Sequence, residues 1–460
     1  MLIRFVVSNF LSFDEETEFN MLAGNFKQHK QHVYKVGKLK VLRAAAIYGA
    51  NAAGKSNLIK AIDTLKNIVE EGGVFSFLEQ KKFKLNPANK EKPIQFEMEF
   101  SIKNKIYAYG ISINKGKIKE EWLYESGITK EDKLIFERTT DKKGKINIRL
   151  GKRQLSAKQK LLIELLEENL IKEDETVIGK FELLKIREVT MCRNWIADSL
   201  LVVYPQDKPS NFFINRFIVS EGGKEGIENI VKILDLGIAT LKTELIEGQD
   251  YFGKDYEQDY FEEIMVGVGE DRSIIYHEEN GLLHLVKIDD KLYVEKVVSL
   301  HKGTDGNVEF NLEEESLGTQ RMVDFIPLFF LMLVKDMVVL IDEIDQSLHV
   351  NLLYRFLEES LKNEDAQGQL IFTTHESNLL DLNILRPDEI WFAEKDRSKG
   401  STQFYSLSEF KPRYDLDIRK GYLQGRYGAI PFLADLENLN WSSLATKEEE
   451  SQNETNQSNA

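Results

Sequence analysis

The chain has 460 residues, of which 42% are hydrophobic and 30% charged, as is typical of a folded protein with room for more than one lobe. A single cysteine, Cys192, excludes an intramolecular disulfide framework and any cysteine-cluster metal site. The longest strongly apolar stretch, Phe325–Val334, is too short to span a bilayer, and Met1–Phe10 lacks the cleavage site of a signal peptide. We therefore expect a cytoplasmic protein with no membrane partner.

The net charge of −15 argues against a globally basic nucleic-acid-binding protein, but the charge is unevenly distributed. Residues 81–160 contain 21 Lys and Arg against 10 Asp and Glu, a balance of +11. A second basic run, residues 27–43, has no acid. Such runs are more often solvated faces than a groove for DNA or RNA, and the sequence leaves both interpretations open.

The first part of the chain is expected to form a hairpin, a buried strand and a helix. Residues 2–7 and 13–21 have the pattern of paired strands, and Val41–Tyr48 is an apolar run. Apolar residues recur at helical spacing over Asn57–Val69. Between this strand and this helix lies Gly-Ala-Asn-Ala-Ala-Gly-Lys-Ser, a complete G-x-x-x-x-G-K-S motif, which we call the phosphate-binding loop (residues 49–56).

The loop predicts a site for the phosphates of a nucleotide bound with Mg²⁺. Its backbone N–H groups and the N-terminus of the following helix form a cradle for anions. Lys55 would place a positive charge on the β- and γ-phosphates, and the Ser56 hydroxyl would ligate Mg²⁺. The residues expected to bind the nucleotide here are Gly49, Ala50, Asn51, Ala52, Ala53, Gly54, Lys55, Ser56 and Asn57.

The pattern then changes several times. It predicts short strands over residues 94–148, helices over 153–200, a helix pair over 224–247 and irregular strands over 248–295. After Val297 helices and strands alternate as in a parallel sheet. The expected elements there are a helix over Gln320–Val334, a strand over Met337–Ile341, a helix over Leu352–Leu361 and a strand over Gln369–Thr374. Residues 441–460 have few apolar side chains, and we expect them to be disordered.

Two acids and a histidine follow strands of this C-terminal region. Asp342 and Glu343 come directly after a buried strand, at the sheet edge where ligands bind. Asp342 would hold Mg²⁺ through water, and Glu343 would polarise an attacking water. His375 fits a sensor that hydrogen-bonds the γ-phosphate, and Lys55 completes the expected catalytic set. The alternatives are a helix-capping role for Asp342 and a structural role for His375.

A Ser-x-Gly-x-Gln sequence precedes the apolar helix that begins near Gln320. Ser316 and Gly318 would make the helix N-terminus an anion site, because glycine allows close backbone approach. The alternative is a plain N-cap with Ser316 as the capping residue. Taken by itself, the sequence favours the N-cap.

The order of these motifs resembles the ATP-binding-cassette (ABC) ATPases of the SMC and RecF type. The chain is more closely similar to stand-alone bacterial AAA family ATPases related to the ATPase half of OLD proteins, such as the RloA-type and abortive-infection ATPases. In that family the segment 315–321 is the signature segment. The similarity covers nearly the whole chain, through Asn9–Phe13, Glu315–Arg321, Asp342–His349, Thr373–His375 and Gly425–Pro431.

The resemblance implies an α/β fold of the ABC-ATPase head type, a P-loop NTPase with a mixed central sheet, flanking helices, an antiparallel β subdomain and a helical insertion. It divides the chain into lobe I (1–150), a helical or mixed insertion (151–298), lobe II (299–440) and a tail (441–460). It also implies a homodimer or higher homo-oligomer in which two heads sandwich two ATP molecules. Ser316 and Gly318, with Gln320 beside them, would bind the ATP held by Lys55 of the other copy.

Some positions depart from the family pattern. His349 stands where SMC-type heads have Asp, and Leu11 where many relatives have Arg. For the glutamine expected after the sheet of lobe I, Gln95 is a weak candidate. The segment after His375 is too short for the nuclease domain that OLD enzymes append, so another polypeptide would cut any nucleic acid.

The expected function is therefore a Mg²⁺-dependent ATPase that acts as a nucleotide-driven scaffold or switch for a separately encoded effector. By family likeness that effector is a nuclease and the setting is bacterial anti-phage defence. The first alternative is a RecF- or SMC-like DNA-repair ATPase that binds DNA through residues 81–160. The second is a module that uses ATP only structurally, which Glu343 disfavours.

Overall fold

The computed structural model describes residues 1–127, 131–151, 157–207, 223–234, 237–253, 273–278, 281–288, 291–414 and 416–430. The tail expected to be disordered, residues 441–460, lies outside the described residues. No helix in the described ranges is both long and apolar enough to cross a membrane.

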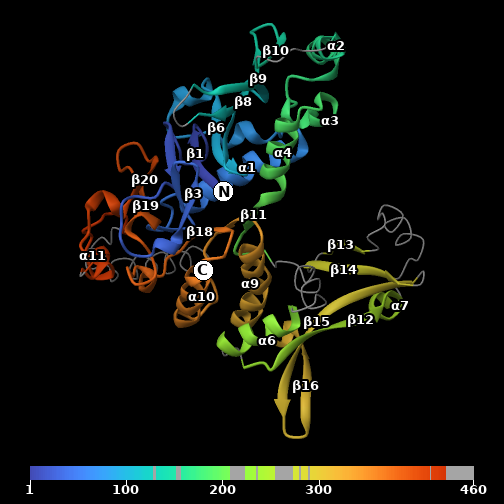
Figure 1. The fold of residues 1–460 in the computed structure, drawn as a ribbon, viewed down its shortest axis with the longest axis vertical. Helices are drawn as coiled ribbons and strands as arrows, with labels where there is room; N and C mark the ends of the chain where they lie inside the picture. Colours follow the sequence, from blue (N-terminus) through green and yellow to red (C-terminus); the bar gives the residue numbers. More distant parts are fainter. Residues whose placement is uncertain are drawn as a thin grey trace, which may run out of the picture.

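A six-stranded sheet lies at the centre of the molecule (Figure 1). The strand order is β11–β17–β18–β5–β19–β20, and every pairing is parallel except that of the edge strand β20. The strands are β5 (Ala44–Tyr48), β11 (Leu200–Val203), β17 (Val338–Ile341), β18 (Gln369–Thr373), β19 (Ile390–Lys395) and β20 (Thr402–Ser406). Because these strands come from distant parts of the chain, their carboxyl edge gathers residues that are far apart in sequence.

Helices pack on the central sheet, and only some of the helices in the structure were predicted from apolar spacing in the sequence. The described helices are α1 (Lys55–Glu71), α2 (Ala157–Leu165), α3 (Phe181–Leu184), α4 (Arg187–Ser199), α6 (Gly223–Leu234), α7 (Gly248–Phe252), α9 (Leu317–Val334), α10 (Val350–Lys362) and α11 (Ile418–Leu423). The predicted helices over residues 57–69, 320–334 and 352–361 correspond to α1, α9 and α10.

Both faces of the central sheet are buried, as a parallel sheet requires. On β5 the side chains of Ala45 and Ile47 belong to one apolar core, and those of Ala44, Ala46 and Tyr48 to another. The first core includes α1, α4 and the antiparallel sheet, and the second includes α9 and α10. The segment after β5 is therefore held between two packed layers.

A seven-stranded antiparallel sheet packs over α1, in the order β10–β9–β8–β7–β6–β1–β2. Its strands are β1 (Leu2–Ser8), β2 (Thr17–Asn20), β6 (Ile94–Ile102), β7 (Lys105–Asn114), β8 (Lys117–Ser126), β9 (Lys133–Thr140) and β10 (Ile146–Leu150). The predicted N-terminal hairpin and the predicted strands over 94–148 are confirmed. The antiparallel β subdomain and the ABC-type head fold expected from the sequence are thus present.

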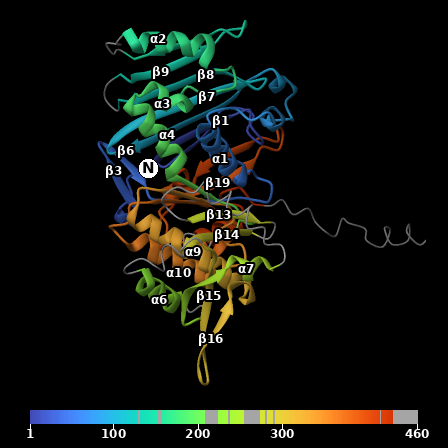
Figure 2. The same cartoon turned by 90° about the vertical axis from the view of Figure 1, so that its right-hand side faces the viewer.

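A third, five-stranded sheet lies on the side of α9 away from the antiparallel sheet (Figure 1), and its β15–β16 part reaches the end of the molecule opposite β9 (Figure 2). Its strands are β12 (Thr240–Glu247), β13 (Ser273–Glu278), β14 (Gly281–Ile288), β15 (Lys291–Gly303) and β16 (Gly306–Asn311). The β15–β16 hairpin extends away from the rest of the chain (Figure 1). Leu241 and Val297 of this sheet share a small core with Val323 and Ile326 of α9.

Two predicted elements are wrong. Residues 224–247 are not a helix pair, because β12 replaces the second helix and pairs with β15 along eight residues. Val41–Tyr48 is not one strand, because the strand structure is interrupted at Arg43, between β4 (Leu39–Leu42) and β5. β4 instead forms a small separate sheet with β3 (Val33–Val36). In both cases the tertiary partner, and not the local pattern, decides the structure.

Candidate functional site

The phosphate-binding loop connects β5 to α1 and has left-handed backbone at three positions. The φ angle is +156° at Gly49, +61° at Ala52 and +104° at Gly54. A Cβ atom on Gly49 would lie 2.3 Å from the carbonyl oxygen of Ala393, and one on Gly54 would lie 2.1 Å from Thr402 Oγ1. Both glycines are therefore required for the loop to pack against β19 and β20.

Polar side chains from neighbouring segments form hydrogen bonds with the loop and with the start of α1. Asn57 Nδ2 donates to Ser12 Oγ (2.8 Å), and Ser12 Oγ lies 2.7 Å from Thr402 Oγ1. Thr402 Oγ1 donates to the carbonyl oxygen of Ala53 (2.8 Å). Ser12 belongs to the Asn-Phe-x-Ser-Phe motif singled out in the sequence, but Thr402 had no local signal, because only the fold brings β20 to the loop.

Lys55 is buried and folded onto its own loop. Its Nζ donates to the carbonyl oxygens of Gly49 (2.9 Å) and Ala50 (3.2 Å). Burial lowers its pKa to about 8, although the carboxylates of Asp342 and Glu343 act in the opposite direction. A phosphate bound in the loop would replace the two carbonyl oxygens as the partner of the Lys55 ammonium, and its negative charge would make the hydrogen bonds stronger.

The two predicted acids meet at one threonine. Thr373 Oγ1 donates to Asp342 Oδ1 (2.6 Å) and accepts from the backbone N–H of Glu343 (2.8 Å). Asp342 is 4% exposed, and Glu343 has a φ of +50°, which is strained for a residue with a side chain. Thr373 was not predicted as a site residue, although its position at the end of a buried strand is visible in the sequence.

His375 lies beside the same groups. Its backbone N–H donates to the Asp345 carboxylate, at 3.3 and 3.4 Å from the two oxygens. Burial first, and then the positive charge of Lys55, lowers the pKa of His375. The imidazole is therefore neutral at pH 7, where one ring nitrogen can donate and the other accept.

Ser316 caps α9, as the alternative interpretation predicted. Its Oγ accepts from the backbone N–H of Thr319 (3.1 Å), and Gln320 Nε2 donates to the carbonyl oxygen of Glu315 (2.8 Å). A Cβ on Gly318 would lie 2.9 Å from the carbonyl oxygen of Ser347 in the loop after Glu343. Capping uses the Ser316 side chain but leaves the residue exposed.

The structure brings only part of the predicted set together. Residues 49–57, Asp342, Glu343 and His375 gather at the carboxyl edge of the central sheet, where Lys55 and His375 interact electrostatically with both acids. The signature segment is not joined to them: within the described residues no hydrogen bond links it to the phosphate-binding loop.

A glutamine also lies at this edge, and it is not Gln95. Gln206 lies in the exposed turn after β11, the strand that pairs in parallel with β17, so this turn is at the carboxyl end of the strand next to the one that carries Asp342. Gln95 lies on β6 of the antiparallel sheet, where its side chain bonds Ser8 Oγ (3.2 Å). The sequence signal was the apolar run Leu200–Val203, which precedes Tyr-Pro-Gln-Asp; we placed its first residue at the end of a helical region and assigned the rest to no element.

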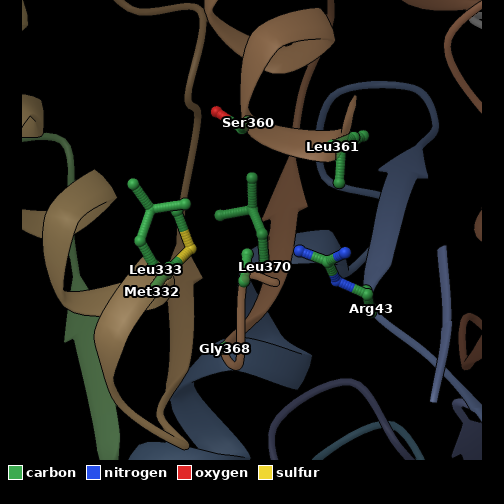
Figure 3. Close-up of a pocket in the computed structure, with 8 residues that line it drawn as sticks. Arg43, Met332, Leu333, Ser360, Leu361, Gly368 and Leu370 are labelled. Carbon is green, nitrogen blue, oxygen red and sulfur yellow. The ribbon is translucent and has the colours of Figure 1, made fainter. Parts of the chain in front are cut away.

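A cavity of about 440 Å³ opens next to the N-terminus of α1. Ser12 and Asn57 line the side toward the loop, and Leu11, Phe83 and Leu85 supply apolar surface. Four lysines, Gln80 and Gly400 complete the lining. Its mixed lining and size suit a nucleoside joined to phosphates at the loop. A second cavity, between the ends of α9 and α10 beside Arg43, holds only about 10 Å³ and is mostly apolar (Figure 3). That volume accommodates at most one water molecule.

The chain has the fold of a P-loop NTPase of the ABC-type head class. This is defined by a central parallel sheet, a phosphate-binding loop that leads into a helix N-terminus, and an acid pair and a histidine at the ends of neighbouring strands. The chain belongs to the family described as "AAA domain, putative AbiEii toxin, Type IV TA system", whose profile matches residues 44–147 and 232–381. It is thus a member of an AAA ATPase family.

Solved structures similar to the chain include SMC head domains. One, in complex with the C-winged helix domain of ScpA, is 14% identical, with a TM-score of 0.44 and coverage of 89% of this chain and 99% of that one. The SMC head domain from Thermotoga maritima is 14% identical, with a TM-score of 0.39 and coverage of 88% and 98%. An Smc head from Pyrococcus furiosus, bound to the C-terminal domain of ScpA, is 16% identical, with a TM-score of 0.37 and coverage of 92% and 99%. A search of curated proteins found no match.

Proposed function

We propose that this protein binds and hydrolyses Mg²⁺-ATP between two copies of itself and uses that cycle to hold or release a separately encoded effector. The observation that supports the ATPase most strongly is the convergence of Lys55, Asp342, Glu343 and His375 at the sheet edge beside the phosphate-binding loop.

The residues present suit both ATP and Mg²⁺. Backbone N–H groups at the start of α1 and the Lys55 ammonium would bind the phosphates. Thr373 engages Asp342 Oδ1, and within the described residues no hydrogen bond reaches Oδ2. Asp342, the Ser56 hydroxyl and phosphate oxygens are the hard ligands that Mg²⁺ prefers, and the ion would supply charge neutralisation at the β- and γ-phosphates.

Glu343 is the proposed general base for the attacking water. Its strained backbone is fixed because its N–H is bound by Thr373, which limits where the carboxylate can reach. Neutral His375 would hydrogen-bond the γ-phosphate. The cavity beside Asn57 would hold the nucleoside.

The proposed second half of each site comes from the partner copy. Ser316 is exposed, and Leu317 at the start of α9 is 71% exposed, the highest value among the large apolar side chains of the described residues. Ser316, Gly318 and Gln320 would close on the γ-phosphate held by the other copy's loop. That arrangement explains why the signature segment makes no hydrogen bond to the phosphate-binding loop of its own chain.

Size-exclusion chromatography with Mg²⁺-ATP tests this proposal. Glu343→Gln keeps phosphate binding but removes the base, so we expect it to elute as a dimer with ATP and as a smaller species without it. Lys55→Ala should lose nucleotide binding and show no ATP-dependent shift. An unchanged elution position of Glu343→Gln would contradict nucleotide sharing between copies.

The effector role is proposed from family membership, since the description of the matching family names a "putative AbiEii toxin, Type IV TA system". The motifs of this chain account for ATP chemistry alone, so the effector would be a second protein. We propose that this effector is a nuclease acting in anti-phage defence. Co-purification of the protein with the product of an adjacent gene, released by ATP, is the expected result. Co-expression that yields only the ATPase, in all nucleotide states, would refute this part.

Direct DNA binding through residues 81–160 receives less support. Several of its basic side chains are engaged by acids: Lys105 by Glu125 (2.9 Å), Lys115 by Glu91 (3.0 Å), Lys117 by Glu173 and Arg149 by Glu137. Paired cations release fewer counterions on contact with phosphates. We do not propose this function.

A further inference from the structure

The cavity beside the start of α1, which the proposed function assigns to the nucleoside, has a strongly cationic wall. Among the described residues that line it are Lys81, Lys82, Lys84 and Lys395, and no aspartate or glutamate is among them. Like charges gathered in one place repel one another, and a nucleoside carries no charge that would offset them. The ligand of this cavity therefore has to bring negative charge to the lysines, unless they are paired within the protein.

Lys82 is paired within the protein. Its Nζ donates to the carbonyl oxygen of Lys90 (3.0 Å) and to Asn114 Oδ1 (2.8 Å). It also lies 2.9 Å from Glu79 Oε2, and the residue is only 7% exposed. Lys82 is therefore a structural residue of the wall and is not free to bind a ligand.

Lys81, Lys84 and Lys395 are different, because all three are exposed and their ammonium groups make no ion pair or hydrogen bond within the described residues. The nearest acid in the sequence is engaged elsewhere. Asp396 Oδ1, next to Lys395, accepts from two backbone N–H groups of its own turn, both at 2.8 Å. The described part of the protein thus leaves three positive charges around the cavity without a partner.

The three lysines lie on the nucleoside side of the site and not on the side of the acid pair. Lys395 ends β19 directly across from Thr402, whose hydroxyl donates to the phosphate-binding loop. The carbonyl oxygen of Lys81 accepts from the backbone N–H of Leu11 (2.6 Å), which lines the cavity as well. Lys55, which interacts with the acid pair, does not line this cavity. The three charges are therefore separate from those that would hold the γ-phosphate.

Apolar surface lies in the same cavity. Leu85 is 64% exposed and packs against the chain at Gly400, where an added Cβ would lie 2.4 Å from Leu85 Cδ1. Leu11 and Phe83 add to this surface. A wall that is part apolar and part cationic suits a ligand that joins a planar base to an anionic group.

We propose that this cavity binds a nucleotide that carries a phosphate on its ribose in addition to its 5′ phosphate chain. The loop would hold the 5′ chain, the apolar surface would contact the base, and Lys81, Lys84 and Lys395 would surround the ribose phosphate. Lysine ammonium groups bind phosphate as point charges, without the fixed geometry that arginine requires. Because such a nucleotide occupies the same loop, it would compete with ATP. This inference rests on the proposed function, to which it adds a second class of ligand.

Calorimetric titration with Mg²⁺ tests the proposal in the Glu343→Gln variant, which lacks the proposed base. The probes are ATP and the two forms of ATP that carry one further phosphate, at the ribose 2′ or 3′ oxygen. At least one of these two forms should bind about ten- to a hundredfold more tightly than ATP, as expected for hydrogen bonds to a charged group. Added NaCl should reduce the difference, since the lysines are exposed to solvent.

The lysines are tested together. In the same background, the combined substitutions Lys81→Gln, Lys84→Gln and Lys395→Gln remove the three charges but keep polar side chains. The ribose-phosphorylated form should then bind at most about twofold more tightly than ATP.

The combined substitutions Lys35→Gln, Lys38→Gln and Lys40→Gln are the matched control. These lysines are exposed on the β3–β4 hairpin, and within the described residues they too make no ion pair. β4 leads to the amino end of β5, whereas the phosphate-binding loop follows its carboxyl end. The control removes the same charge at the other end of β5, so it should keep the full preference for the ribose-phosphorylated form.

The inference is overturned if neither ribose-phosphorylated form binds more tightly than ATP. Equal weakening of ATP and both forms by the substitutions at the cavity would also overturn it, because the lysines would then act on the 5′ chain. Tighter binding of a 5′-triphosphorylated dinucleotide than of either form would assign the cavity to the end of a nucleic acid instead. Normal ATP binding without a preference leaves the proposed function intact, whereas no binding of any probe by Glu343→Gln would refute that function, and this inference with it.

Discussion

At the residue scale, Thr373 is the side chain that holds both acids of the site, the proposed Mg²⁺ ligand Asp342 and the proposed base Glu343. One hydroxyl serves the Asp342 carboxylate and the Glu343 backbone, and the side chain is fully buried. We expect Thr373→Val to lower kcat for ATP by about ten- to a hundredfold, since a buried hydrogen bond to a charged group contributes about 1.5–3 kcal/mol. The required Mg²⁺ concentration should also rise. Thr373→Ser, which keeps the hydroxyl, should retain activity; equal turnover in Thr373→Val and the parent would contradict the assignment.

Lys55 gives the site a pH dependence whose sign can be worked out. Its pKa is about 8 in the free protein, below the ordinary value for lysine, so the ammonium loses its proton as the pH rises through 8. Phosphate favours the charged form, so binding takes up a proton above that pH. We expect the Kd for Mg²⁺-ATP to rise about tenfold per pH unit above about pH 8. Titrations between pH 7.5 and 9.5 that give a flat Kd would contradict the role of Lys55, provided circular dichroism shows an intact fold.

The sequence predicted those site residues that belong to contiguous motifs, and it missed those that come to the site from elsewhere. Residues 49–57, Asp342, Glu343 and His375 lie at strand ends that apolar runs reveal. Thr402 and Gln206 reach the same edge only through strand order, which a single sequence does not show. The assigned roles of all these residues stay predictions until the variants are measured.

At the element scale, the loop depends on backbone that only glycine allows. Gly54→Ala would add a Cβ 2.1 Å from Thr402 Oγ1 at a φ of +104°, so the loop would have to leave β20. We expect loss of ATP binding and a fall in stability of about 1–3 kcal/mol. Gly116→Ala is the control, because it shares a positive φ (+69°) but its Cβ would meet nothing within 4 Å. It should bind ATP normally; calorimetric titration of both variants makes the comparison, and normal ATP binding by Gly54→Ala would contradict the close packing.

The elements that were predicted correctly are those whose pattern needs no partner to interpret it. Helices α1 and α10 show clear apolar spacing, and β6 alternates along its length. β12 was mistaken for a helix because its own residues do not show a clear strand pattern. Only its pairing with β15 shows that it is a strand. The sheet formed by β12–β16 therefore lies partly in the predicted insertion, residues 151–298, where the sequence indicated only a helix pair and irregular strands, and partly after it.

At the scale of the whole molecule, the sharing of ATP between copies can be tested by mixing two inactive variants. Lys55→Ala lacks the phosphate-binding lysine, and Ser316→Arg would obstruct closure on the partner. In a symmetric dimer the mixed pair contains one site with both defects and one with neither, because the intact Lys55 faces the intact Ser316. We therefore expect each variant alone to release almost no phosphate, and an equal mixture to recover up to about a quarter of parental turnover at random exchange. If each chain completed its own site, both variants would stay inactive however they were mixed, and the absence of recovery with verified mixed dimers would rule out the sharing.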